Sequence, residues 1–208
     1  MSRHAQSIDS KVIARIYGLK RGAVFTPMHF QDLGGPKAIR HALSRHTNDG
    51  TIRRLARGLY DYPKKHPKLG YLAPSSDAIA KALAGRDATR LQPTGAYAAN
   101  LLGLSTQVPM KVAYLTDGRS RKVQIGNRQI ILKHTTPRNM ATAGRISGDV
   151  IQALQHLGRR HVGPDVITQL DKRLTDSDRK QLMKDIRYAP AWIADVFRKL
   201  GRVNDDNG

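Results

Sequence analysis

The chain has 208 residues and is strongly basic, with 36 lysines and arginines against 16 acidic residues and a net charge of +20. This length can hold one large or two small domains, each with a modest core. The absence of cysteine excludes disulfides and thiolate zinc sites. No apolar run approaches the ~20 residues that span a bilayer, and the first residues lack the apolar core of a secretory signal, so we expect a cytoplasmic protein without membrane contact.

The positive charge is concentrated in the first two thirds of the chain. Residues 1–70 carry 14 bases and 4 acids, and residues 71–145 carry 11 and 3, whereas residues 146–208 carry 11 and 9. A region with this excess of positive charge creates an electric field that attracts a polyanion. Arginine supplies 22 of the 36 bases, and its planar fork matches phosphate and guanine. Composition therefore favours a nucleic acid as partner.

The first elements follow the order of a winged helix-turn-helix. Thr26 and Pro27 form a helix start, because the hydroxyl can accept from free backbone N–H groups and proline presets φ. Gly34 and Gly35 end that helix, and Gly58 is the expected positive-φ residue of a hairpin turn. The predicted elements are helices over residues 7–17, 27–33 and 36–48, followed by strands over residues 51–56 and 59–62.

The helix over residues 36–48 has two chemically different faces. Ile39, Ala42 and Leu43 follow helical spacing and can face a core, whereas the other positions are cationic or polar. A solvated basic helix beside an ordinary hairpin is the alternative, but the arginines at this offset favour a helix in the major groove and a wing on phosphates or the minor groove. We expect Arg40 and Arg45 to read bases. The candidate DNA-binding residues are Lys37, Arg40, His41, Ser44, Arg45, Asn48, Arg53, Arg54 and Arg57.

A basic, proline-broken linker is predicted over residues 64–68, which divides the chain into domains 1–68 and 69–208. The second domain is expected to be a small α+β domain with an antiparallel sheet and a C-terminal helical segment. Basic residues on that sheet could extend a nucleic-acid surface or solvate an exposed face, and the pattern leaves both open. The predicted strands are 89–92, 111–116, 122–125 and 129–134, and the helices are 77–84, 96–102, 165–174, 177–186 and 190–200, with a further helix from Ser147.

The sequence shows no pattern that indicates catalysis. It contains no Gly-rich phosphate loop, nucleophile elbow or metal-spaced His/Asp cluster. The eight histidines are dispersed, and His41 and His46 are five residues apart, so they do not share a helical face as a metal pair would require. We therefore expect no catalytic residue, no metal, no cofactor and no enzymatic activity.

Two segments resemble AbiEi-type antitoxins of abortive-infection, type IV toxin–antitoxin operons and their related winged-helix regulators. These are GTIRRLARGLYDYPKK from Gly50 and the longer run from Arg90 to His134, in which PTGAYAANLLGLSTQVP is the more specific part. The resemblance implies a repressor of its own operon that binds inverted repeats in two copies, as monomers or a weak homodimer. It also implies a C-terminal part that counters a nucleotidyltransferase-like toxin, which need not be gripped directly. The family's DNA contacts map onto the second helix and the wing, at Lys37, Arg40, His41, Ser44, Arg45, Arg53, Arg54 and Arg57.

Two other functions compete with this one. The charge of +20 also suits a basic RNA- or ribosome-associated protein. A toxin-neutralising module in which DNA binding is secondary is the second alternative.

Overall fold

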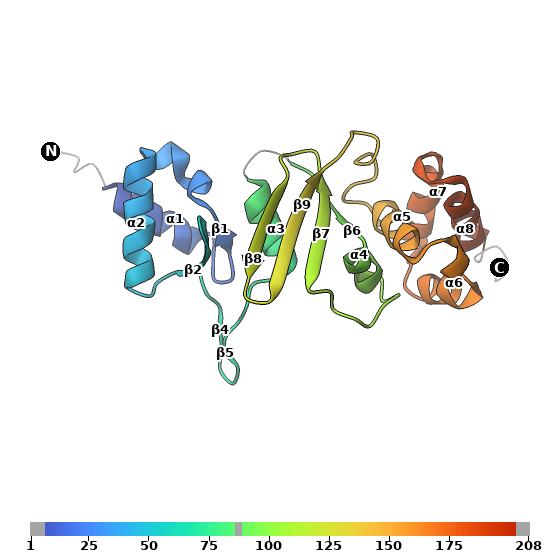
Figure 1. The fold of residues 1–208 in the computed structure, drawn as a ribbon, viewed down its shortest axis with the longest axis horizontal. Helices are drawn as coiled ribbons and strands as arrows, with labels where there is room; N and C mark the ends of the chain where they lie inside the picture. Colours follow the sequence, from blue (N-terminus) through green and yellow to red (C-terminus); the bar gives the residue numbers. More distant parts are fainter. Residues whose placement is uncertain (1–6, 86–88, 203–208) are drawn as a thin grey trace. The chain divides into compact units, whose positions relative to one another are not determined.

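A computed structural model describes residues 7–85 and 89–202 (Figure 1). The chain forms two compact units, Met1–Ala88 with Val123–Gly126, and Thr89–Lys122 with Asn127–Gly208. Helices and strands occur in both, which confirms the predicted α+β class. Within the described ranges, no helix is long and apolar enough to cross a membrane.

The first unit contains the elements predicted for its sequence, with small shifts at their ends. α2 begins and ends at the predicted residues, whereas the helix over residues 27–33 is a 3-10 helix. Its start is held by His29, whose Nδ1 accepts the backbone N–H of Thr26 at 3.1 Å. The elements are α1 (Ile8–Gly18), β1 (Val24–Phe25), η1 (Pro27–Leu33), α2 (Pro36–Asn48), β2 (Arg53–Ala56), β3 (Leu59–Asp61), β4 (Lys65–His66), β5 (Gly70–Tyr71) and α3 (Ser76–Ala84).

A small apolar core holds α1, η1, α2 and the first sheet together. The rings of Phe25 and Phe30 pack edge to face with centroids 5.5 Å apart, and Phe25 stacks on Tyr60 at 6.3 Å. Ile39 and Leu43 of α2 are almost fully buried beside them, so the apolar stripe predicted for this helix faces the core.

The first sheet has the strand order β1-β3-β2, and its pairs are antiparallel. The turn between β2 and β3 uses Gly58 at a φ of +72°, a left-handed conformation that favours glycine, as predicted. In this register Arg53 lies opposite Asp61 and Arg54 lies opposite Tyr60. Neighbouring arginines on β2 therefore project from opposite faces of the strand.

The segment predicted as a linker is a second hairpin, so that prediction is wrong. Lys65 pairs with Tyr71, and His66 pairs with Gly70, whose φ of +70° closes a three-residue turn. His66 Nδ1 accepts the backbone N–H groups of Lys68 and Leu69 at 3.2 and 3.3 Å, which fixes the turn locally. The first unit also continues to residue 88 rather than ending at 68, because α3 packs against β1.

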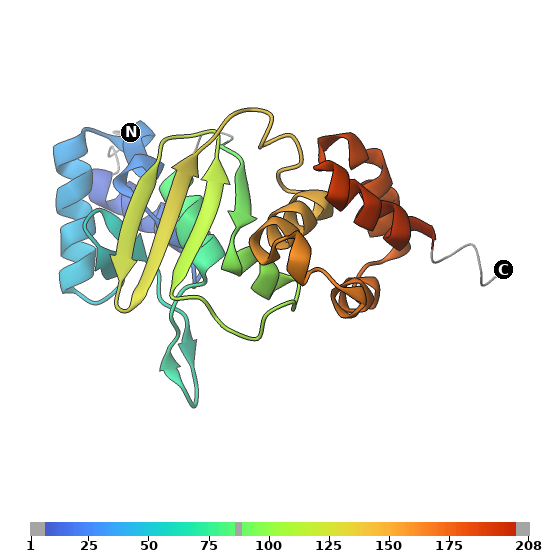
Figure 2. The ribbon, with the colours of Figure 1, turned by 45° about the vertical axis from the view of Figure 1, so that its right-hand side comes forward.

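The four-stranded sheet is mixed, which corrects the antiparallel sheet expected from sequence; three of its strands belong to the second unit, and the fourth is divided between the two units. Its strand order is β6-β7-β9-β8, where β6 (Leu91–Thr94) is antiparallel to β7 (Lys111–Thr116) and β7 is parallel to β9 (Arg128–His134). Figure 2 shows β8 (Arg121–Ile125) running opposite to β9 at the edge. The physical reason is burial: Ile130 and Leu132 of β9 are almost fully buried and take the inner position, whereas β8 is half exposed.

Helices complete the second unit. Val150 and Leu154 of α5, Leu170 of α6, Leu182 of α7 and Phe197 of α8 share one buried cluster. The elements are α4 (Ala96–Leu101), α5 (Ile146–Leu157), η2 (Arg159–His161), α6 (Pro164–Asp171), α7 (Asp176–Lys184), η3 (Ile186–Tyr188) and α8 (Ala191–Arg202).

Candidate nucleic-acid interface

The outer face of α2 carries all six helix residues that the sequence singled out. Because Ile39, Ala42 and Leu43 turn toward the core, the residues between them turn toward solvent. The spacing of three and four residues places them in one stripe along the 13-residue helix. The exposed residues of the stripe are Lys37, Arg40, His41, Ser44, Arg45 and Asn48.

The two arginines of this stripe differ in their surroundings. Arg45 lies 3.4 Å from a carboxylate oxygen of Asp9 on α1, although 66% of its side chain stays exposed. The same carboxylate lies 3.4 Å from Nε2 of the buried His46, without hydrogen-bond geometry between these two atoms. Arg40 forms no hydrogen bond or ion pair with the described part of the chain. Arg40 is therefore the free guanidinium of the helix, and Arg45 is partly neutralised.

A groove of about 370 Å³ lies at the start of α2, where the chain turns from η1. Pro27, Met28 and Gln31 form its η1 side. Gly34, Pro36, Ile39 and Arg40 complete the lining, so the free guanidinium borders a mostly apolar surface.

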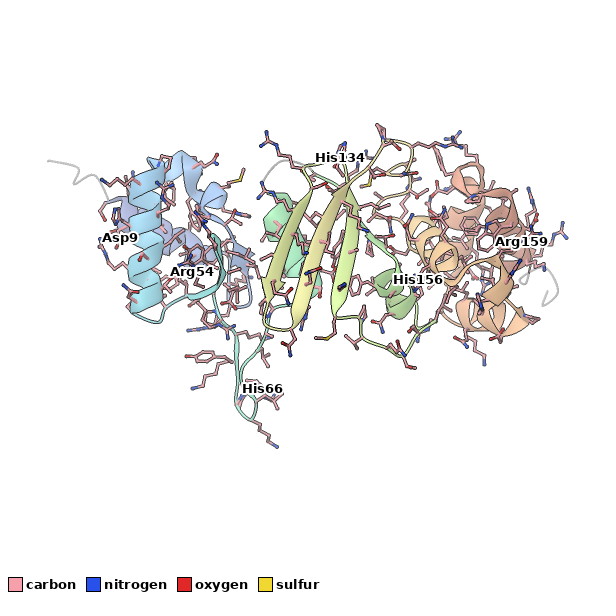
Figure 3. The ribbon with its side chains drawn as sticks, viewed as in Figure 1. Asp9, Arg54, His66, His134, His156 and Arg159 are labelled. Atoms are coloured by element: carbon pink, nitrogen blue, oxygen red, sulfur yellow. The ribbon has the colours of Figure 1, made fainter. Side chains whose placement is uncertain are left out.

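The three arginines of the β2–β3 hairpin differ in their surroundings. Arg54 and Arg57 are exposed and have no ion pair within the described residues (Figure 3 labels Arg54). Arg53 instead donates from Nε and Nη2 to the buried carboxylate of Asp61, at 3.0 and 2.5 Å. The hydrogen bond to Asp61 raises the pKa of Arg53.

Arg53 also ties the second hairpin to the first. Its Nη2 donates to the carbonyl of Leu72 at 2.9 Å, and its guanidinium carbon lies 5.4 Å from the centre of the Tyr71 ring. The structure therefore engages Arg53 inside the unit, whereas the sequence placed it among the DNA contacts. An aspartate within the apolar run Leu59–Asp61 was the available signal, since a buried carboxylate needs a cation.

The second hairpin adds cations that sequence reasoning missed. Lys64, Lys65 and Lys68 are exposed on or beside β4 and β5. They were assigned to a linker because two-residue strands are too short to show an alternating pattern.

The basic residues of the second unit's sheet lie at different depths. Arg119, Lys122 and Lys133 are exposed, whereas Arg121 and Arg128 are half-buried. The sheet therefore presents scattered cations rather than a continuous stripe.

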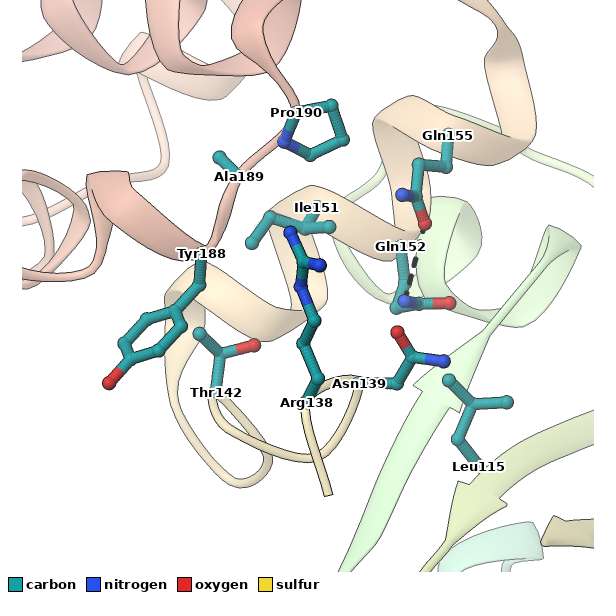
Figure 4. Close-up of a pocket in the computed structure, with 10 residues that line it drawn as sticks. All are labelled: Leu115, Arg138, Asn139, Thr142, Ile151, Gln152, Gln155, Tyr188, Ala189 and Pro190. Atoms are coloured by element: carbon teal, nitrogen blue, oxygen red, sulfur yellow. Dashed lines mark hydrogen bonds between the residues drawn. The ribbon is translucent and has the colours of Figure 1, made fainter. Parts of the chain in front are cut away.

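The second unit contains a cavity of about 590 Å³ between the loop before α5, α5 itself and the segment before α8 (Figure 4). Gln152 Nε2 donates to Gln155 Oε1 at 3.4 Å across its wall. The residues drawn in Figure 4 include amides, Thr142, Tyr188 and Arg138, but no carboxylate, thiol or histidine. Such a lining can hold a polar group by hydrogen bonds but offers no acid–base pair. Among the residues that the structure describes, no group of three His, Cys, Asp or Glu side chains could hold a metal ion.

Comparison with known proteins identifies a family for this chain. A search of the curated proteins found no match to this chain. A family model matches residues 11–182, which covers all the elements from β1 to α6 and most of α1 and α7. The chain therefore belongs to the Family of unknown function (DUF6088).

Proposed function

We propose that the first unit is a winged helix-turn-helix that binds double-stranded DNA. The observation that carries the proposal is the outer face of α2, where six exposed residues supply three cations and three neutral polar groups and no acid. The same compact unit holds the hairpin with Arg54 and Arg57 exposed. A helix with this face fits the major groove, which is about 12 Å wide.

The helix would supply the sequence-dependent contacts. Arg40 is free to donate two hydrogen bonds to the O6 and N7 atoms of a guanine. Asn48 has the bidentate geometry that suits adenine, and Lys37 at the start of the helix suits a phosphate. Arg45 must first leave Asp9, so it contributes less than an unpaired arginine would.

The hairpin would supply sequence-independent affinity. Arg54 and Arg57 project into solvent, where a phosphate can replace water and release counterions. Arg53 is not part of the proposed interface, because its guanidinium already neutralises Asp61.

The biological role that we propose is a repressor of its own operon that serves as the antitoxin of an AbiE-like system. The resemblance of the segments from Gly50 and from Arg90 supports this role. It implies an operator with inverted repeats and two bound copies. A promoter fusion tests the repressor role, since the chain should lower expression from its own promoter. Co-expression with the adjacent gene product tests the antitoxin role, since the chain should relieve growth arrest.

The decisive experiment on DNA binding compares nucleic acids directly. Duplexes are selected from a random pool with the full chain, and affinities for the selected duplex, a scrambled duplex and a structured RNA are measured at ~0.15 M salt, where non-specific contacts are already weakened. We expect the selected duplex to bind at least ~1000-fold more tightly than the scrambled one. Preference for the RNA would instead support an RNA- or ribosome-associated protein.

A further inference from the structure

The β4–β5 ribbon, which we define as residues 64–72, is the most prominent projection of the first unit (Figures 1 and 3). Only two pairs, Lys65 with Tyr71 and His66 with Gly70, form its ladder, and Leu72 N donates to the carbonyl of Lys64 at 2.8 Å below them. A ribbon this short needs support to hold its direction.

That support comes from Arg53. Its guanidinium, fixed by Asp61, donates to Leu72 at one edge of the ribbon and lies over Tyr71. The ammonium of Lys65 approaches the same ring at 5.9 Å. The base of the ribbon is therefore anchored to β2 and β3, and its tip is presented to solvent.

The charge of the ribbon is of one sign. Lys64, Lys65 and Lys68 are exposed, and no acidic residue occurs between residues 62 and 76. Three lysines brought together on a projecting hairpin repel one another unless an anion lies between them. A phosphate backbone supplies such anions at regular intervals and releases its counterions in return.

The tip of the ribbon carries apolar residues on both sides of Lys68. Leu69 is 73% exposed, in a turn that also contains Pro67. Leucine and proline are residue types that proteins insert from the minor groove between base steps. His66 adds a donor, because two backbone N–H groups occupy Nδ1 and the neutral ring then carries its proton on Nε2.

The composition of the ribbon favours the minor groove. Of the side chains that read base edges in the major groove, residues 64–72 contain lysine but no arginine, asparagine, glutamine or acidic residue. Lysine also contacts phosphates, so the ribbon offers little that is specific to the major groove. A histidine donor suits the adenine N3 and thymine O2 acceptors of the minor groove.

We infer that the β4–β5 ribbon is a second DNA-contacting element, whose tip enters the minor groove with Leu69 against the bases and its lysines on the flanking phosphates. This inference rests on the proposed function, because it requires that the first unit bind duplex DNA.

The test uses the full chain and the duplex selected from a random pool. Leu69→Ala and Lys68→Ala are compared with Leu19→Ala and Lys180→Ala, which remove an exposed leucine of the first unit and an exposed lysine of the second. We expect Leu69→Ala to weaken binding about tenfold, as the loss of a buried leucine side chain would. Lys68→Ala should lower the slope of log K against log salt by about 0.9. Both controls should bind as the unaltered chain does.

The contact with the minor groove is tested by changing the DNA. Replacing adenine by 2,6-diaminopurine adds an amino group to the minor groove and leaves the major-groove edge unchanged. This should weaken the unaltered chain and leave Leu69→Ala almost unaffected. Because Leu69 is exposed, its removal should not change the melting temperature. An unchanged melting temperature shows that the variant is folded.

Two results would overturn the inference in distinguishable ways. If the unaltered chain binds the duplex and the ribbon variants behave as their controls, the ribbon does not contact DNA and the interface on α2 stands. If the unaltered chain binds no duplex, the proposed function fails and the inference fails with it.

Discussion

The contact between Arg53 and Asp61 allows a prediction that separates a structural arginine from a DNA-binding one. We consider Arg53→Met, which keeps much of the side-chain volume and removes the charge. Asp61 is 1% exposed and would lose both of its hydrogen bonds from Arg53. Removing one partner of a buried ion pair costs about 3–5 kcal/mol. Because a third of the Arg53 side chain is exposed, water can reach the site, and we expect the lower end, about 3 kcal/mol.

A double variant tests the cause of that loss. Arg53→Met combined with Asp61→Asn leaves no unpaired buried charge, so it should recover at least about 1 kcal/mol relative to additive behaviour. The matched control is Arg54→Met, the exposed neighbour on β2, which should change stability by less than about 0.5 kcal/mol.

The assay is urea unfolding of the full chain, with hydrogen exchange of β3 amides to follow the first unit. The chain has a single tryptophan, Trp192 in the second unit, so its fluorescence reports on that unit separately. If Arg53→Met leaves the unfolding of the first unit unchanged and only weakens DNA binding, the structural role of Arg53 is refuted.

Three further predictions concern the wing, the flank of α2 and acid stability. Arg57→Ala should weaken binding to selected and scrambled duplexes alike and lower the salt slope by about 0.9, and a selective loss would contradict a phosphate contact. Asp9→Asn should tighten binding by up to ~5-fold in a titration because it releases Arg45, and weaker binding would count against this pairing. The hydrogen bond from Arg90 lowers the pKa of Asp117, so its contribution to stability is present above the ordinary carboxyl pKa of about 3.9 and is lost as pH falls through the lowered value. Asp117→Asn should reduce the fall of the urea unfolding midpoint as the pH is lowered into the acid range. An unchanged fall would be inconsistent with this linkage.

Local patterns in the sequence were sufficient to predict most elements. The bounds of α2 were predicted because Pro36 marks the start, Ile39 and Leu43 mark the buried face, and Gly50 follows the end. The alternation in Lys111–Thr116 likewise identified β7.

The pairing of strands and the choice of an ion-pair partner depend on residues distant in sequence, so the sequence alone did not reveal them. The alternation in β8 and β9 allows either order beside β7, so alternation alone did not predict that β9 takes the inner position. Arg53 and Arg54 are adjacent and chemically identical, and only the register opposite Asp61 and Tyr60 distinguishes them. The exposed stripe of α2 was predictable because it follows from the periodicity of one helix.

Chemical protection of guanine N7 atoms in the selected duplex tests the major-groove placement of α2 most directly. If α2 lies there, the full chain protects particular N7 atoms, and Arg40→Ala exposes one of them while the rest of the footprint remains. A footprint without N7 protection, or one that Arg40→Ala leaves unchanged, would contradict DNA recognition by this helix.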